Sequence, residues 1–255
     1  MQAAQEKGLQ QGQAAAVVIA QGLTLASTGD FEAALKQFQT AGATNPNLPI
    51  EVLDQAIADA QRKNDPTQKN LMLARQYYIA TLGLAAVKKG DFEAARADFS
   101  KAGAGNPMLP IKFLDQSISD SQSKNDPALS NFKIARQDYM NDTDPFSQTD
   151  LTYRRYACEH SAIVVVASAP AAKVDDEVKR WQRIYPTASG GIAGPTNPDY
   201  VQIIAASFLT CEQARSLKDE LIRKNLANGP FIGGEYSECS ACNITVNAPE
   251  HGDRP

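Results

Sequence analysis

The stretch "DYVQIIAASFLTCEQARSLKDEL" (199–221) marks a change in the chain, from helical repeats to a strand that leads straight into a helix. Residues 200–208 are mostly apolar, which is typical of a buried strand. Ala214, Leu217 and Leu221 then recur at helical spacing, so an amphipathic helix is predicted over 211–224. Cys211 lies where the strand and the helix meet.

The neighbouring segments extend this pattern in both directions. "SAIVVVASA" (161–169) predicts a central strand, and residues 174–186 predict a helix. The glycine-rich segment 187–196 suits an edge strand, and a last strand is expected near 230–236. The order β-α-β-β-α-β with right-handed crossovers gives a four-stranded antiparallel sheet with both helices on one face, the α+β ferredoxin-like arrangement. Its other face is left open as the expected ligand surface.

An internal repeat fills the N-terminal half. Residues 29–66 align with 90–127 at an offset of 61, with 25 of 38 positions identical, and the match continues from 70–79 to 131–140. The chain therefore holds two copies and the start of a third, which we expect to act as a cap. A repeat of this length predicts stacked helical units that bury their apolar faces on one another.

Each copy reads as three helices, whose ends are marked by capping residues and prolines. A long helix is expected to start at Asp65-Pro66 and Asp126-Pro127. A second is expected to follow Asp30 and Asp91 and to end at Gly42 and Gly103, with those glycines in the left-handed conformation. A third is expected to start at Pro49 and Pro110.

The first two helices of each copy resemble a tetratricopeptide repeat. The residues that carry the resemblance are Gly22, Gly29, Phe31, Ala34, Phe38, Ala41 and Pro46, with Gly83, Gly90, Phe92, Ala95, Phe99, Ala102 and Pro107 in the next copy. The third helix departs from the motif and stretches its period of about 34 residues to 61. The resemblance implies a protein partner bound by the helical repeats. A spacer or self-association module is the alternative.

Composition limits the classes of ligand. The 255-residue chain has a formal charge of −4 and a pI near 5.3, which disfavours nucleic acid as a partner. No apolar run approaches the ~20 residues of a membrane-spanning helix. The start, "MQAAQEKGLQ", lacks the features of a secretory signal, so the chain is either cytoplasmic or the mature form of an exported protein.

The polar segment 141–150 contains Asp-Pro and interrupts the repeat, so the domain boundary is expected there. We therefore predict an all-α helical repeat domain over 1–140, a linker over 141–150 and an α+β domain over 151–242. Residues 243–255 are expected to form a disordered tail.

The segment from Tyr200 to Leu226 resembles the signature of the SPOR (sporulation-related repeat) family, whose likeness here covers about 161–235. The shared features are Tyr-Val-Gln entering a strand, Ser-Phe at its end, and a helix with Glu, Ala and Leu at set spacings. The first strand lacks a polar residue where the second has Gln202, which departs from a strict match. The resemblance implies a non-enzymatic protein of the cell envelope or periplasm that binds peptidoglycan glycan strands stripped of their stem peptides, as at sites of cell division.

Such strands are polyols, so a binder needs hydroxyl and amide side chains with apolar ring platforms. Alternate residues of a strand share a face, which would place Gln202 and Ala206 on the same side. The candidate glycan-binding residues are Gln202, Ser207, Phe208, Ser168 and Ser189. For the polar residues the alternative is a capping or solvated role, and for Phe208 it is a place in the core.

Four cysteines lie in the second half: Cys158, Cys211, Cys239 and Cys242. Cys239 and Cys242 form a CxxC, but a zinc site would need a second such pair, and a redox pair would need a helix start. Structural disulfides are therefore expected, which implies an oxidising compartment. A bridge from Cys158 to Cys239 or Cys242 suits the proposed topology, and Cys211 would pair only if the tail wraps back.

No catalytic residues, metal site or cofactor are predicted. His160 and His251 lie apart from any serine or cysteine with an acid at useful spacing, and no phosphate loop is present in the sequence. We therefore expect a binding protein rather than an enzyme. The alternative function is a protein-interaction adaptor or scaffold that does not bind glycan.

Overall fold

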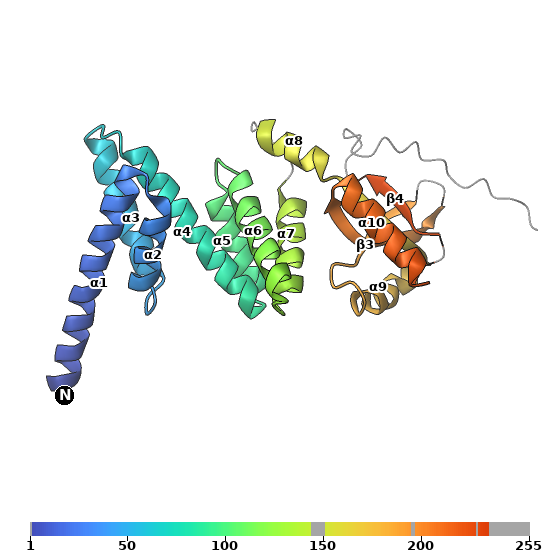
Figure 1. Cartoon of the computed structure of the whole chain (residues 1–255), viewed down its shortest axis with the longest axis horizontal. Helices are drawn as coiled ribbons and strands as arrows, with labels where there is room; N and C mark the ends of the chain where they lie inside the picture. The colour runs from blue at the N-terminus through green and yellow to red at the C-terminus, as the bar shows by residue number, and fades with distance from the viewer. Residues whose placement is uncertain (1, 144–150, 195–196, 228, 235–255) are drawn as a thin grey trace, which may run out of the picture. The chain divides into compact units, whose positions relative to one another are not determined.

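The computed structural model describes residues 2–143, 151–194, 197–227 and 229–234. The chain is mostly helical, with a small four-stranded antiparallel sheet toward its C-terminus (Figure 1). It divides into two compact units, Met1–Ala135 and Arg136–Pro255. This division falls inside a helix, ahead of the linker expected over 141–150, of which residues 144–150 lie outside the described part.

In the described part of the first unit, residues 2–135, the regular secondary structure is helical. The helices are α1 (Gln2–Thr28), α2 (Phe31–Ala41), α3 (Asn47–Arg62), α4 (Gln68–Lys89), α5 (Phe92–Ala102), α6 (Met108–Lys124) and α7 (Leu129–Asp142), the last of which runs into the second unit. The helices α2 and α5 begin as predicted, because Asp30 and Asp91 accept hydrogen bonds from the backbone N–H groups of Ala33 and Ala94.

Both copies of the repeat make the same contact between a glycine and a phenylalanine ring. Gly22 and Gly83 are buried against the rings of Phe38 and Phe99, and a Cβ at either glycine would lie 2.7 Å from the ring's Cε1. Even a Cβ atom does not fit at these two positions. The absence of a side chain at the glycines therefore lets the paired helices pack closely. The aromatic rings fill the space, with Phe38 0% and Phe99 1% exposed.

Four of the predicted helix starts, those of α3, α4, α6 and α7, were wrong by about two residues. The Asn-Asp-Pro segments form turns: Asn64 is left-handed (φ 51°), and the Asp65 carboxylate accepts from the Thr67 N–H at 2.9 Å, so α4 starts two residues past the proline. The helices α3 and α6 start at Asn47 and Met108, ahead of the expected prolines.

Gly42 and Gly103 end their helices in the right-handed region, with φ near −81° and −80°, so the predicted left-handed conformation is wrong. Space explains Gly42 instead, since a Cβ there would lie 2.1 Å from the Tyr78 hydroxyl oxygen.

The second unit contains the predicted sheet. Its elements are α8 (Leu151–Glu159), β1 (Ala162–Pro170), the 3₁₀ turn η1 (Ala171–Lys173), α9 (Val174–Gln182), β2 (Ser189–Gly194), β3 (Asn197–Leu209), α10 (Cys211–Arg223) and β4 (Phe231–Gly234). The strand order is β2-β3-β1-β4 with every neighbouring pair antiparallel. The helix α8 was not predicted, and α9 ends at Gln182 rather than at Pro186.

Both α9 and α10 cover the same face of this sheet. Trp181 of α9 and Leu221 of α10 are buried in one cluster with Val164, Ile203 and Ile232 of the strands. A capping box starts α10, in which the Thr210 hydroxyl accepts from the Gln213 N–H and the Gln213 side chain accepts from the Thr210 N–H. Strand and helix in the opening stretch are thus held at their junction by local sequence.

The opposite face of the sheet is not open at its centre. Ile163, Val165 and Ile204 form a separate buried cluster there, with 8%, 2% and 8% of each residue exposed. This cluster also explains a glycine in the edge strand β2, because a Cβ at Gly191 would lie 2.7 Å from Cδ1 of Ile204. The expectation of a broad, open ligand surface is therefore wrong at these positions.

Candidate functional site

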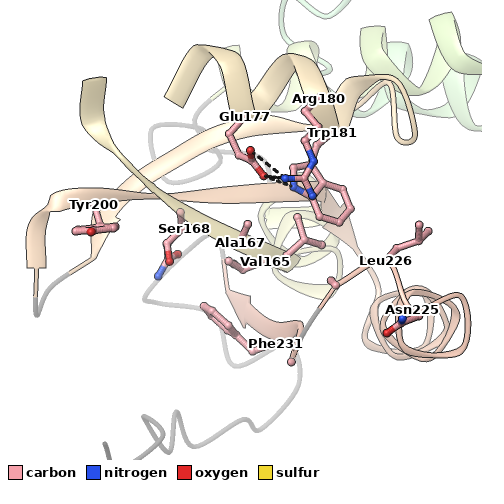
Figure 2. A pocket seen from close by; sticks show the side chains of 14 residues that line it. Val165, Ala167, Ser168, Glu177, Arg180, Trp181, Tyr200, Asn225, Leu226 and Phe231 are labelled. Atoms are coloured by element: carbon pink, nitrogen blue, oxygen red, sulfur yellow. Dashed lines mark hydrogen bonds and ion pairs between the residues drawn. The ribbon is translucent and has the colours of Figure 1, made fainter. Parts of the chain in front are cut away.

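A groove of about 960 Å³ lies along strand β1. It is lined by Val165, Val166, Ala167, Ser168, Glu177, Arg180, Trp181, Tyr200, Gln202, Asn225, Leu226, Ala227, Gly229 and Phe231 (Figure 2). Because alternate residues of a strand face opposite sides, four consecutive lining residues, 165–168, place the groove along the edge of β1.

The short strand β4 accounts for this edge. It pairs with β1 only from Ala162 to Val165, whereas β3 pairs with β1 as far as Pro170. Within the described residues, 166–170 of β1 therefore have no strand on their β4 side. The connection from α10 to β4 forms the far wall of the groove through Asn225, Leu226, Ala227 and Gly229.

Helix α9 supplies the charged side chains of the groove. Its acidic residues lie in the first turn and its basic residues in the last, which suits the helix dipole. The carboxylate of Glu177 accepts a hydrogen bond from Trp181 Nε1 at 3.1 Å and pairs with Arg180 Nη1 at 3.0 Å, as the dashed lines in Figure 2 show. The Arg180 guanidinium carbon lies 5.9 Å from the centre of the Trp181 ring, within cation–π range.

Tyr185 and Glu220 form a second set of contacts next to Trp181. The Trp181 ring stacks with Tyr185 at 6.5 Å between centroids, and the Tyr185 hydroxyl donates to Glu220 at 3.3 Å. Burial raises the pKa of Tyr185, and the nearby Glu220 carboxylate raises it further. The hydrogen bond from Lys224 lowers the pKa of Glu220 and keeps that group ionised.

Two aromatic rings are exposed beside the groove. Tyr200 of β3 is 44% exposed and Phe231 of β4 is 42% exposed, although large aromatic side chains are usually buried. Figure 2 shows both rings standing clear of the strands that carry them. Exposed rings of this kind are suited to stacking on a ligand.

The structure brings together two of the candidate residues. Ser168 and Gln202 are direct cross-strand partners on β1 and β3, and both line the groove. Their hydroxyl and amide groups offer donors and acceptors together. Asn225 adds a second amide from the far wall, where it adopts a left-handed conformation with φ 53° just after α10.

The other candidates lie elsewhere. Phe208 is 1% exposed, has a φ of 54°, and offers its carbonyl to Arg136 Nη1 at 3.1 Å, so its ring is part of the core. Ser207 and Ser189 are half-buried and do not line the groove, and Ser189 pairs with Ile204 on the edge strand β2.

Ala206 does not share a face with Gln202 as strict alternation predicted. The β1–β3 register shifts between Val164↔Ala206 and Val165↔Ile204, so β3 contains one extra residue between Ile204 and Ala206. Such a bulge reverses the alternation of side chains. Ala206 consequently pairs with Val164, a residue of the helix-covered core.

Cys158 and Cys211 are each disulfide-bonded, and no described cysteine is free. Cys239, Cys242, His251 and the expected tail lie outside the described residues. His160 is half-buried, and its ring stacks on Tyr156 with centroids 3.9 Å apart.

Sequence reasoning missed Trp181, Arg180, Glu177, Tyr200, Asn225 and Phe231. One signal could have found the wall on α9: the chain has a single tryptophan, with an acid four residues before it and a basic residue just before it. Tyr200 and Phe231 gave no such signal, since apolar residues at strand ends are usually core.

Comparisons with protein-family models, with curated proteins and with solved structures gave no match. In the part of the chain described, no helix is both long and apolar enough to cross a membrane. The same residues contain no group of three or more His, Cys, Asp or Glu placed to hold a metal ion.

Proposed function

We propose that this chain is a non-enzymatic envelope protein that binds peptidoglycan glycan strands in the groove along β1 and a protein partner through its helical repeats. One observation carries the glycan proposal: two exposed aromatic rings flank a groove that also presents the side chains of Ser168, Gln202 and Asn225. The apolar faces of sugar rings stack on aromatic rings, while sugar hydroxyls need amide and hydroxyl partners.

The size and charge of the groove agree with this ligand class. Its volume, about 960 Å³, lies at the upper end of the range for small-molecule sites, which suits an extended ligand more than a single ring. Its charged side chains, Glu177 and Arg180, pair with each other, so the lining has no net charge. A polar groove without an excess of one charge fits a ligand that is recognised mainly through its hydroxyl groups.

The fold of the second unit supports the proposed SPOR-like, ferredoxin-like domain. The element order β1-α9-β2-β3-α10-β4 and the strand order β2-β3-β1-β4 are those expected for this arrangement. The disulfide-bonded Cys158 and Cys211 support an oxidising compartment such as the periplasm, with the cytoplasm as the alternative.

The first unit is proposed to be tetratricopeptide-like. The matching contacts of Gly22 with Phe38 and of Gly83 with Phe99 support that proposal, because this motif relies on small and large residues that face each other between paired helices. Its partner would be a peptide or protein bound by the repeats.

Co-sedimentation of the whole chain with peptidoglycan sacculi tests the glycan proposal. Half of the sacculi are first treated with an amidase that removes the stem peptides. We expect more protein to pellet with the stripped sacculi. The variants Tyr200→Ala and Gln202→Ala should each reduce pelleting, whereas Ser207→Ala, outside the groove, should not. Ile222→Ala is a matched control for Tyr200→Ala, since Ile222 is 53% exposed on α10 and is not a lining residue.

Absence of pelleting with both preparations, by protein shown to be folded, would rule out the glycan proposal. The adaptor function would then be favoured. The edge of β1 offers a place where such an adaptor would bind a peptide. Residues 166–170 of β1 have no described strand on one side, so an extended peptide could add there as a further strand.

A further inference from the structure

We infer that Arg180 selects stripped glycan strands by binding the carboxylate that removal of the stem peptide leaves on the sugar. This inference rests on the proposed function. Hydrolysis of the amide that joins stem peptide to glycan adds water across the C–N bond, which leaves a carboxylate on the glycan and an amine on the released peptide. A stripped strand thus carries an anion where an intact strand carries a neutral amide.

The Arg180 side chain is placed to meet such an anion. It lines the groove and is 63% exposed, more than twice the exposed fraction of its partner Glu177, which is 24%. A guanidinium has five N–H donors in one plane, a geometry that matches both oxygens of a carboxylate. Only Nη1 of Arg180 is engaged, by the two carboxylate oxygens of Glu177 at 3.0 and 3.3 Å. Its Nε and Nη2 have no acceptor among the described residues and remain for a ligand.

Glu177 acts as a positioning residue for this guanidinium. Its carboxylate is itself held by the indole N–H of Trp181, which is 2% exposed and fixed in the core. The Arg180 guanidinium is therefore held beside the Trp181 ring before a ligand binds. This arrangement reduces the side-chain conformational entropy lost on binding.

The same ion pair limits the range of the attraction. Of the 14 lining residues, Arg180 is the one that carries a positive charge, and Glu177 the one that carries a negative charge. The paired charges largely cancel at a distance, so the groove attracts an anion only at contact. Selection should then depend on the position of the carboxylate along the glycan rather than on its total charge.

The test compares two forms of one ligand. Glycan oligosaccharides from amidase-stripped sacculi are used directly, or after their carboxylates are converted to primary amides, which keep hydrogen-bonding groups but lose the charge. The full chain should bind the carboxylate form roughly three- to tenfold more tightly at low ionic strength. High salt should shrink that preference, because the contact is at the surface.

Variants assign the preference to one residue. Arg180→Gln should bind both forms equally, and Arg180→Lys should keep part of the preference, since a lysine provides the charge without the planar fork. Arg183→Gln removes an exposed arginine from the end of the same helix, outside the lining, and should behave like the unmodified chain.

Three outcomes would overturn the inference, and each is distinct from failure of the proposed function. The first is equal binding of both forms by the unmodified chain. The second is an Arg180→Gln variant that weakens both forms by the same factor, which would indicate a merely structural role. The third is an Arg180→Gln variant that binds both forms as tightly as the unmodified chain and so keeps the preference. Absence of binding to either form would instead contradict the glycan proposal itself.

Discussion

The hydroxyl of Tyr78 shows how single atoms determine the packing of the repeats. It donates to the Pro46 carbonyl at 3.1 Å, and its residue is 1% exposed. Gly42 borders it so closely that a Cβ there would lie 2.1 Å from the hydroxyl oxygen. Burial raises the pKa of Tyr78 to about 12, because the ionised phenolate would be desolvated.

Tyr78→Phe should change the pH dependence of stability. A raised pKa in the folded state means that the unfolded state loses its proton first, near pH 10, so stability falls as pH rises from about 10 toward 12. Below that window the variant should be less stable by about 1 kcal/mol, because the hydrogen bond is lost. The difference from the unmodified chain should narrow between pH 10 and 12. Urea denaturation at a series of pH values would measure the difference in unfolding free energy between the two chains. A difference that does not vary with pH would contradict the claim that burial raises the pKa of Tyr78.

At the scale of elements, the packing of α4 on α5 depends on Gly83. Gly83→Ala would put a methyl group within 2.7 Å of the Phe99 ring, so we expect a loss of about 1–3 kcal/mol in unfolding free energy despite the better helix propensity of alanine. Phe99→Leu in the same chain should recover part of this loss, since the smaller side chain leaves room. Thermal denaturation of both single variants and the double variant would measure the coupling. Additive effects would mean that the two residues do not share the proposed contact.

The elements of the sheet were predictable from sequence, and the groove was not. The strand over 200–208 and the helix over 211–224 follow from local apolar patterns, so they were found close to their observed bounds. Two features of the sheet are not revealed by local patterns. One is the bulge between Ile204 and Ala206, and the other is the early end of the β1–β4 pairing at Val165 and Phe231. The bulge separates Ala206 from the face of Gln202, and the short pairing leaves residues 166–170 of β1 without a described strand on the side where the groove lies.

At the scale of the whole molecule, the repeat places the same residue type in both units, so its role in the second unit can be compared with its role in the first. Arg75 and Arg136 are equivalent positions, 61 residues apart. Arg75 forms an exposed ion pair with Asp54. Arg136 instead donates to the Phe208 carbonyl at 3.1 Å and to the Tyr156 hydroxyl at 2.6 Å, all within the second unit. The same residue type therefore has two environments in one chain.

Arg136→Met should consequently destabilise the second unit by about 1.5–3 kcal/mol, because it leaves a carbonyl without its charged donor. Arg75→Met should cost less than about 1 kcal/mol, as expected for an exposed pair. Amide hydrogen exchange would assign each loss to a unit. Equal effects of the two substitutions would show that the Arg136 contacts add nothing beyond a surface interaction.

The single tryptophan gives the most direct measurement of the central claim, because Trp181 lines the proposed glycan groove. The full chain would be titrated with oligosaccharides from amidase-stripped sacculi while tryptophan emission is recorded. The glycan proposal predicts a saturable change in emission that Gln202→Ala weakens and Ser207→Ala leaves intact. Emission that stays constant at oligosaccharide concentrations that prevent the protein from pelleting with sacculi would contradict binding in this groove.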